Sequence, residues 1–216
     1  MDIRKRYILT GGALVFLIVS LVTFARFSRG ASYFTAFENA KIKGPKDAPI
    51  HLVVYSDFQC PACRASLTPI EELRNQFSQL IQVEFRHYPL ERAHRWTTLA
   101  ASFAECAAEQ GKFWEFHDRL FSEQPLWSVS NDALSFFARY SEELNLDKGK
   151  LEQCIRNPKT LSRIKREYSM GTKQEIQSTP TIFINGHRLV GALQLKMQGK
   201  EIVEEELKKL NKNVKA

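Results

Sequence analysis

The chain has 216 residues, of which 44% are hydrophobic and 25% are charged, and its formal net charge is +7. These are the proportions of an ordinary globular protein that is long enough to bury a core without metal ions or disulfides. Much of the positive charge lies in residues 1–30, and no basic stripe with interleaved aromatic residues follows. Nucleic-acid binding is therefore disfavoured, and a mixed, solvated surface is expected.

An apolar run occupies residues 8–24 and follows a basic cluster at residues 4–6. Its length is close to the lower limit of about 17 residues for a helix that spans a bilayer. The flanking residues Tyr7 and Phe27 can lie in the interface as aromatic anchors. Because a basic cluster before such a helix stays in the cytoplasm, everything after the helix would be exported.

These features predict a cytoplasmic end over residues 1–6, a signal anchor over 7–27 and a linker over 28–44. The expected location is the inner membrane, with the folded part on the extracytoplasmic side. A cleaved signal peptide, which would release a soluble periplasmic protein, is the alternative. Arg26 and Arg29 disfavour it, because they separate the apolar run from the small residues at which cleavage would occur.

Residues 45–91 have the pattern of a strand, a helix and a second strand. The runs 50–55 and 81–88 are short and rich in β-branched or aromatic residues. Between them, apolar residues recur at spacings of three and four over 67–77, which indicates a helix that Pro69 should kink. Strands in such a unit pair in parallel.

Residues 92–170 lack strand-like runs and are rich in Ala, Glu, Lys, Arg and spaced aromatic residues. This composition predicts several helices, with breaks near Gly111, Pro125 and the pair Asn157 and Pro158.

The final segment, 171–216, begins with a strand at 180–184. The pair Asn185 and Gly186 is a strong hairpin signal and is followed by a returning strand at 187–190. A charged amphipathic helix is expected over about 199–211. The order of elements along the chain is therefore βαβ, then helices, then ββα.

Cys60 and Cys63 enclose Pro61 and Ala62 directly after the first predicted strand. If the helix begins at this motif, Cys60 lies at its N-terminus, where unpaired N–H groups and the helix dipole stabilise a thiolate. Cys63 lies one turn further and would resolve a mixed disulfide formed by Cys60. Pro61 suits the first helical position, which needs no N–H group. We therefore predict a redox pair with Cys60 as nucleophile and no cofactor.

A zinc ribbon is disfavoured because it needs a second such motif, which the sequence lacks.

Three stretches in this order resemble the DsbA-like branch of the thioredoxin superfamily: residues 53–63, 179–181 and 184–186. The stretch 105–117 is similar to the helical insertion of that branch. The resemblance covers about residues 45–210 and implies an α/β thioredoxin fold with an inserted helical domain, here preceded by the predicted transmembrane helix.

The resemblance also implies a role for Thr179 and Pro180. Their peptide bond would be cis and would pack beside the redox pair, and Thr179 would offer its backbone to a bound substrate strand. Because only about 5–6% of bonds before proline are cis in folded proteins, this expectation rests on the resemblance alone.

Two positions depart from the pattern of the family. Val54 stands where many relatives carry an acidic residue near the second thiol, and Glu84 on the neighbouring strand is a candidate substitute, although a solvent-facing Glu84 is favoured. Ala62 stands where the strongest oxidants carry histidine. Without an imidazolium beside Cys60, the redox potential should be less oxidising than about −120 mV, the value of DsbA.

Cys106 and Cys154 are the two remaining cysteines, and both lie in the predicted helical segment. In an oxidising compartment they are expected to form a structural disulfide. Two buried free thiols or a second redox pair are the alternatives.

The predicted function is that of an exported, membrane-tethered oxidoreductase that introduces disulfides into exported proteins by exchange through Cys60 and Cys63. Its partners would be the thiols and disulfides of those proteins and a membrane redox protein that recycles the pair. One alternative is a reductase or isomerase of the same fold, and another is a non-enzymatic binding module or metal carrier that uses the two cysteines as a clamp.

Overall fold

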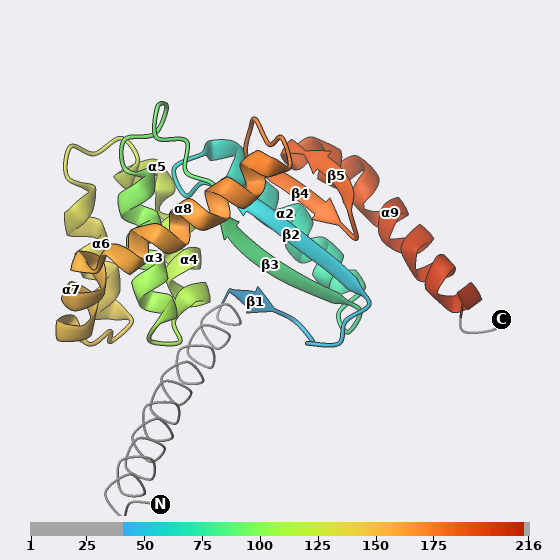
Figure 1. Ribbon diagram of the computed structural model, residues 1–216, viewed down its shortest axis with the longest axis horizontal. Coiled ribbons are helices and arrows are strands. Elements are labelled where there is room, and N and C mark those ends of the chain that lie inside the picture. The colour runs from blue at the N-terminus through green and yellow to red at the C-terminus, as the bar shows by residue number, and fades with distance from the viewer. Residues whose placement is uncertain (1–40, 214–216) are drawn as a thin grey trace, which may run out of the picture. The chain divides into compact units, whose positions relative to one another are not determined.

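The computed structural model describes residues 41–213, and the side chains up to residue 210 (Figure 1). The anchor predicted over 7–27 lies outside the described residues. Within the described residues, no helix has both the length and the apolar character needed to cross a membrane.

A five-stranded mixed sheet has the strand order β1-β3-β2-β4-β5. The bounds are β1 (Ile42–Lys43), β2 (Ile50–Ser56), β3 (Ile81–His87), β4 (Thr181–Ile184) and β5 (His187–Val190). β2 and β3 pair in parallel, as the sequence predicts, and the other neighbours pair antiparallel. β2 lies in the middle of the sheet, and most of its residues are apolar and buried, as is typical of a central strand.

Two helices, α2 (Pro61–Gln76) and α9 (Gly191–Asn213), pack against each other and against one face of the sheet. Their apolar residues, including Ile70, Leu73, Leu195 and Val203, join the strand residues in one core. Burial of this apolar surface is the main force that holds the helices on the sheet.

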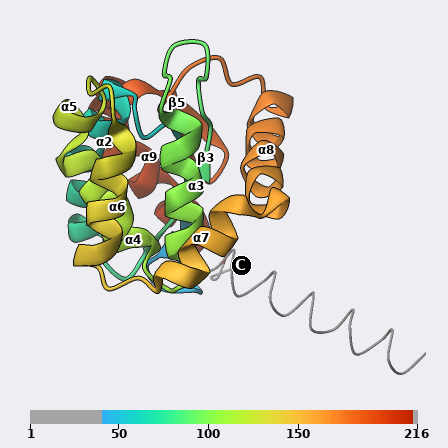
Figure 2. The same cartoon turned by 90° about the vertical axis from the view of Figure 1, so that its left-hand side faces the viewer.

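The remaining helices follow β3 and precede β4, so they form the predicted insertion (Figures 1 and 2). They are α3 (Thr97–Ala108), α4 (Phe113–Ser122), α5 (Gln124–Trp127), α6 (Ala133–Glu143), α7 (Lys148–Arg156) and α8 (Pro158–Lys173). α8 returns from this helical domain to contact β3, where Gly171 approaches the rings of Tyr55 and Tyr88. A Cβ atom at Gly171 would lie 2.8 Å from the Tyr88 ring, so this close approach requires glycine.

Three element boundaries differ from the sequence prediction. The C-terminal helix begins at Gly191, not near residue 199, because buried Leu195 and exposed Leu193 and Met197 obscure a one-sided apolar pattern in its first turns. β1 falls within the predicted linker 28–44. The sequence did not predict this strand, because two residues are too few to show the alternation of a strand. α8 continues past residue 170 to Lys173, which brings Gly171 onto the sheet.

Candidate active site

Cys60 is the residue that caps α2 at its N-terminal end, and Pro61 occupies the first turn. The N–H groups of Cys63 and Arg64 both donate to the Cys60 carbonyl oxygen, at 3.1 and 3.3 Å. The Cys63 side chain therefore lies one helical turn further along and is completely buried, while 7% of Cys60 is exposed. Both cysteines carry free thiols.

The two thiols have opposite acidities. The pKa of Cys60 is lowered to about 5, mainly by a hydrogen bond from the Cys63 thiol. Burial opposes this shift, while the Thr179 side chain and the N–H groups of Cys63 and Ala62 add to it. The pKa of Cys63 is raised well above its usual value by burial and by the neighbouring Cys60. At neutral pH the pair can therefore hold one thiolate, at Cys60, and one thiol, at Cys63.

The peptide bond between Thr179 and Pro180 is cis, as the resemblance implied. It precedes β4, and the Thr179 carbonyl oxygen lies 3.4 Å from the Cys60 sulfur. The hydroxyl of Thr179 is buried, and apart from the Cys60 sulfur, whose pKa this side chain lowers, it has no hydrogen-bond partner among the described residues. Residues far apart in the sequence thus meet at the end of α2.

Asp57 organises the loop that precedes Cys60. Its buried carboxylate accepts hydrogen bonds from Gln59 N–H at 2.7 Å and from the Thr97 hydroxyl at 2.6 Å. Its second oxygen accepts from Leu90 N–H and contacts His94 Nδ1, both at 2.8 Å. The Asp57 N–H group points to the Cys63 sulfur at 3.4 Å. This one residue therefore fixes the loop to both α3 and the second thiol.

The helical domain holds the same loop from the other side. The Gln124 amide donates to the Cys60 carbonyl oxygen at 3.0 Å. The Gln59 side chain donates to the Ser128 carbonyl oxygen at 2.9 Å and accepts from Trp96 N–H at 2.7 Å. The insertion thus positions the cysteine motif directly.

A family model described as thioredoxin matches residues 37–205. The chain belongs to this thioredoxin family. Among curated proteins, the chain is similar to the Na(+)/H(+) antiporter NhaA 3 of Salinispora tropica, at 34% identity over 147 residues. That match covers 68% of this chain but only 22% of the relative.

Solved structures share the fold. Oxidised BdbD from Bacillus subtilis superposes with a TM-score of 0.69 at 22% identity, over 78% of this chain and 92% of that chain. Alpha-DsbA1 from Wolbachia pipientis gives a TM-score of 0.66 at 23% identity, over 79% of this chain and 94% of that chain. The predicted thioredoxin fold with a helical insertion, of the DsbA-like type, is therefore confirmed.

The structure shows the surroundings of Val54, which departs from the family pattern, and of Glu84, its candidate substitute. Val54 is buried in the core beneath α2. Glu84 pairs in register with Val53, the neighbour of Val54, and so lies on the opposite face of the sheet. There it is partly exposed and bonds to Arg86 at 2.6 Å, so it does not replace an acid near Cys63.

Cys106 in α3 and Cys154 in α7 form the expected disulfide inside the helical domain. Next to it lies the completely buried carboxylate of Glu105. Its oxygens contact Lys41 Nζ at 2.5 Å, Arg163 Nε at 2.9 Å and His87 Nε2 at 3.0 Å. Glu167 of α8 also binds the Lys41 ammonium. Ligand atoms of His87, Glu105 and Glu167 lie close enough together to hold a metal ion. However, the Lys41 ammonium binds both carboxylates and compensates their charge.

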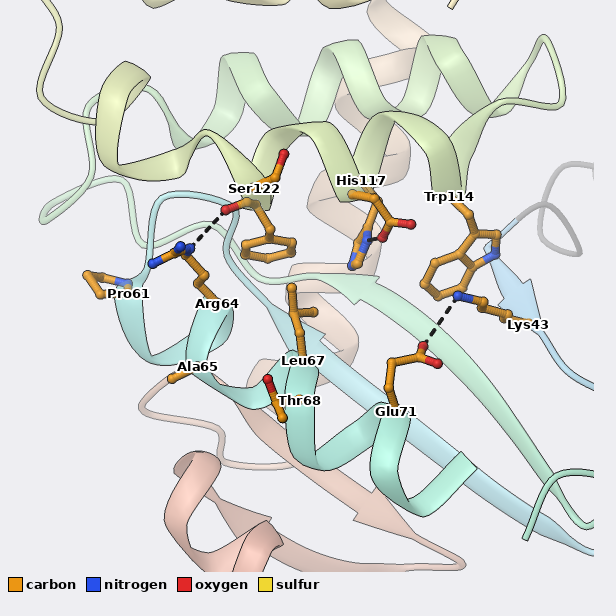
Figure 3. A pocket seen from close by; sticks show the side chains of 12 residues that line it. Lys43, Pro61, Arg64, Ala65, Leu67, Thr68, Glu71, Trp114, His117 and Ser122 are labelled. Carbon is orange, nitrogen blue, oxygen red and sulfur yellow. Dashed lines mark hydrogen bonds and ion pairs between the residues drawn. The ribbon is translucent and has the colours of Figure 1, made fainter. Parts of the chain in front are cut away.

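A groove of about 640 Å³ lies between α2 and α4, beside the cysteine motif (Figure 3). At one end Arg64 Nε donates to the Phe121 carbonyl oxygen at 3.0 Å. At the other end Lys43 pairs with Glu71 at 3.3 Å. Pro61, the first residue of α2, belongs to its wall, so the groove reaches the cysteine motif.

The sequence identified both cysteine pairs, Thr179 and Pro180, but it assigned no role to Asp57, Gln124 or His94. Asp57 follows a buried strand and precedes the motif by three residues, and this position was the available signal. Gln124 gave no signal, because its partners are distant backbone carbonyl groups.

Proposed function

We propose that the chain is an extracytoplasmic thiol–disulfide oxidoreductase that introduces disulfide bonds into exported proteins through Cys60 and Cys63. The observation that carries the proposal is the opposite pKa shift of two thiols one helical turn apart, beside a cis proline. A stabilised thiolate at Cys60 is both a good attacking group and a good leaving group.

The cycle begins with the pair oxidised. A substrate thiolate attacks the Cys60 sulfur, the bond between Cys60 and Cys63 breaks, and Cys63 leaves with the electron pair and takes a proton. A second substrate thiolate then attacks the substrate sulfur of the mixed disulfide and releases Cys60 as a thiolate. The substrate loses two electrons and gains a disulfide, and the two cysteines become reduced.

The acidity of Cys60 supports the oxidising direction. Its pKa of about 5 lies between about 3.5 for DsbA and about 7 for thioredoxin. A lower thiolate pKa stabilises the reduced enzyme and so makes the disulfide a stronger oxidant. We expect a potential between about −270 and −120 mV, the values of thioredoxin and DsbA.

Exposed apolar side chains at the end of β5 and in the first turns of α9 suit unfolded substrates. Val190 is 42% exposed, Leu193 69% and Met197 70%. Val190 pairs with Thr181 across β4 and β5, and Gly191 N–H donates to the Pro180 carbonyl oxygen at 2.8 Å. Unfolded exported proteins present apolar segments near their cysteines, which such a surface can bind.

Two features support an oxidising compartment. The disulfide between Cys106 and Cys154 is of a kind that persists outside the cytoplasm. The apolar run at 8–24 would hold the domain at the inner membrane. Because each cycle leaves two electrons on the enzyme, a membrane redox protein with its own disulfide would recycle the pair.

The potential of the full-length protein, measured by equilibration with glutathione, tests the direction of the reaction. Oxidised protein should also restore activity to a reduced, disulfide-dependent model enzyme, and Cys60→Ser should abolish this effect. Cys63→Ser should instead accumulate mixed disulfides with substrates. A potential near −270 mV would support the reductase alternative. Full activity of Cys60→Ser would contradict the redox role itself.

A further inference from the structure

The Cys63 sulfur must exchange a proton although it has no contact with solvent. Its side chain is 0% exposed, and burial raises its pKa. Among the described residues, the Asp57 N–H and the Ser56 hydroxyl act on this sulfur besides Cys60, and neither is an acid or base at neutral pH. Since Cys63 alternates between disulfide and thiol in the proposed cycle, a route for its proton is needed.

A small cavity of about 30 Å³ provides such a route. Ser56 and Ser66 are among the residues that line this cavity. The Ser56 hydroxyl reaches the Cys63 sulfur, and Ser66 Oγ donates to the Cys63 carbonyl oxygen at 2.7 Å. His117 lines the cavity and also the groove of Figure 3. The volume exceeds the roughly 10–15 Å³ that one water molecule requires, and these three side chains supply polar partners.

His117 has the orientation that the route requires. Its imidazole points from α4 toward α2, between Leu67 and Trp114 (Figure 3). Its Nδ1 atom bonds to the Asp118 carboxylate at 2.8 Å, which fixes the ring and leaves Nε2 as the basic atom of the neutral imidazole. Burial lowers the pKa of His117, and Asp118 opposes this shift.

Charged groups face His117 from three elements. Lys43 of β1 lowers its pKa, and Glu71 of α2 raises it, but these two form an ion pair with each other. Arg74 of α2 also lines the small cavity and pairs with Glu71. On α4, Asp118 is the partner of Nδ1. These charges largely compensate one another, so burial determines the direction of the pKa shift and the imidazole is neutral at rest.

We propose that His117 exchanges the proton of Cys63 with solvent, through the Ser56 hydroxyl and one water molecule in the small cavity. His117 does not touch the reacting sulfurs, so it is a positioning residue for proton exchange. This inference rests on the proposed function and identifies a residue that the cysteine motif does not contain.

The step balances in both directions. When Cys63 leaves as a thiolate, it takes a proton from Ser56, which regains one from the cavity water. His117 Nε2, which carries no proton at rest, takes one from solvent in the groove and passes it to the water. When Cys63 attacks a mixed disulfide, the proton leaves along the same path, and the released thiolate takes a proton from solvent.

The test follows reduced full-length protein after addition of glutathione disulfide, with acid quenching and mass spectrometry. The first phase forms a mixed disulfide at Cys60 and does not require Cys63. The second phase releases glutathione when Cys63 attacks. His117→Phe keeps an aromatic ring in place and should leave the first phase unchanged. It should slow the second phase by about tenfold or more near neutral pH, the scale of a lost acid–base group.

The pH profile and a rescue experiment separate proton exchange from packing. In His117→Phe the second phase should rise steeply with pH, because hydroxide must replace the imidazole. In His117→Ala, added imidazole should restore the rate, because the groove opens to solvent. Phe113→Leu alters a ring of the same cluster, 6.0 Å from His117, and should leave the second phase unchanged.

An equal second-phase rate in His117→Phe and the unmodified protein, between about pH 5 and 9, would overturn the inference. If His117→Phe does not fold, His117→Gln takes its place with the same expectations. Absence of both phases in the unmodified protein would contradict the proposed function, so the two failures are distinguishable.

Discussion

The sulfur of Cys60 lies 3.4 Å from the carbonyl oxygen of Thr179, although 119 positions separate the two residues in the sequence. The same threonine has a buried hydroxyl whose one acceptor among the described residues is the Cys60 sulfur, and its side chain lowers the pKa of Cys60. Thr179 therefore has two separate influences on the site. Its backbone borders the sulfur, and its hydroxyl stabilises the thiolate.

Thr179→Val should raise the pKa of Cys60 by about one to two units, because a hydrogen bond to a charged group contributes about 1.5–3 kcal/mol. The thiolate fraction can be followed by its ultraviolet absorbance as a function of pH. Thr172→Val, on the exposed side of α8, is the matched control and should leave the pKa unchanged. An unaltered titration in Thr179→Val would show that the hydroxyl has no influence.

The alkylation rate of the reduced protein should follow the thiolate form of Cys60. It should stay high at neutral pH and fall as the pH decreases through about 5. The folded pKa lies below that of the unfolded thiol, so the unfolded chain binds more protons between these values. The difference in unfolding free energy between the reduced protein and Cys60→Ser should therefore increase as the pH rises from about 5 to 9. A flat difference would contradict the shift.

Asp57→Asn should destabilise the protein and disturb the site. The carboxylate has four hydrogen-bonding partners, and an amide offers only one acceptor oxygen. Each buried donor left without a partner costs about 1–3 kcal/mol. Urea unfolding measures this loss, and Asp47→Asn at an exposed position is the control. Equal stability of the two variants would show that the loop does not depend on Asp57.

Replacing Cys106 and Cys154 together by serine should lower the free energy of unfolding by about 4 kcal/mol in the chain-entropy model, given a sequence separation of 48. Because the disulfide lies within the helical domain, the alkylation rate of Cys60 should change little in the folded variant. A large change in that rate would instead indicate that the second pair acts on the redox site.

Lys41→Met should be strongly destabilising, by about 3–5 kcal/mol, because it leaves two buried carboxylates without their shared cation. Burial opposes ionisation of Glu105, yet Lys41 and His87 hold its pKa below the usual value. The ionised network therefore stabilises the folded state at neutral pH, and this contribution is lost as the pH falls below about 4.5. Lys46→Met at an exposed position is the control for urea unfolding across pH.

Local sequence signals determined the element order and the cysteine motif. The β-branched run of β2, the pair Asn185 and Gly186, and Pro61 after Cys60 each act over a few residues, so the sequence contains them fully. The start of α9 was wrong because tertiary contacts bury Leu195 while leaving Leu193 exposed, and a local pattern does not record which neighbours are present.

The tertiary structure decided how the motif is supported. The sequence by itself predicted that Cys60 and Cys63 stand one helical turn apart, and hence which thiol would attack and which would resolve. The resemblance already implied that Thr179 lies beside Cys60. Only the fold places Asp57 beside Cys63 and His117 at the wall of the cavity. Acidity and proton access depend on burial and on contacts between distant segments, and such contacts exist only once the chain has folded.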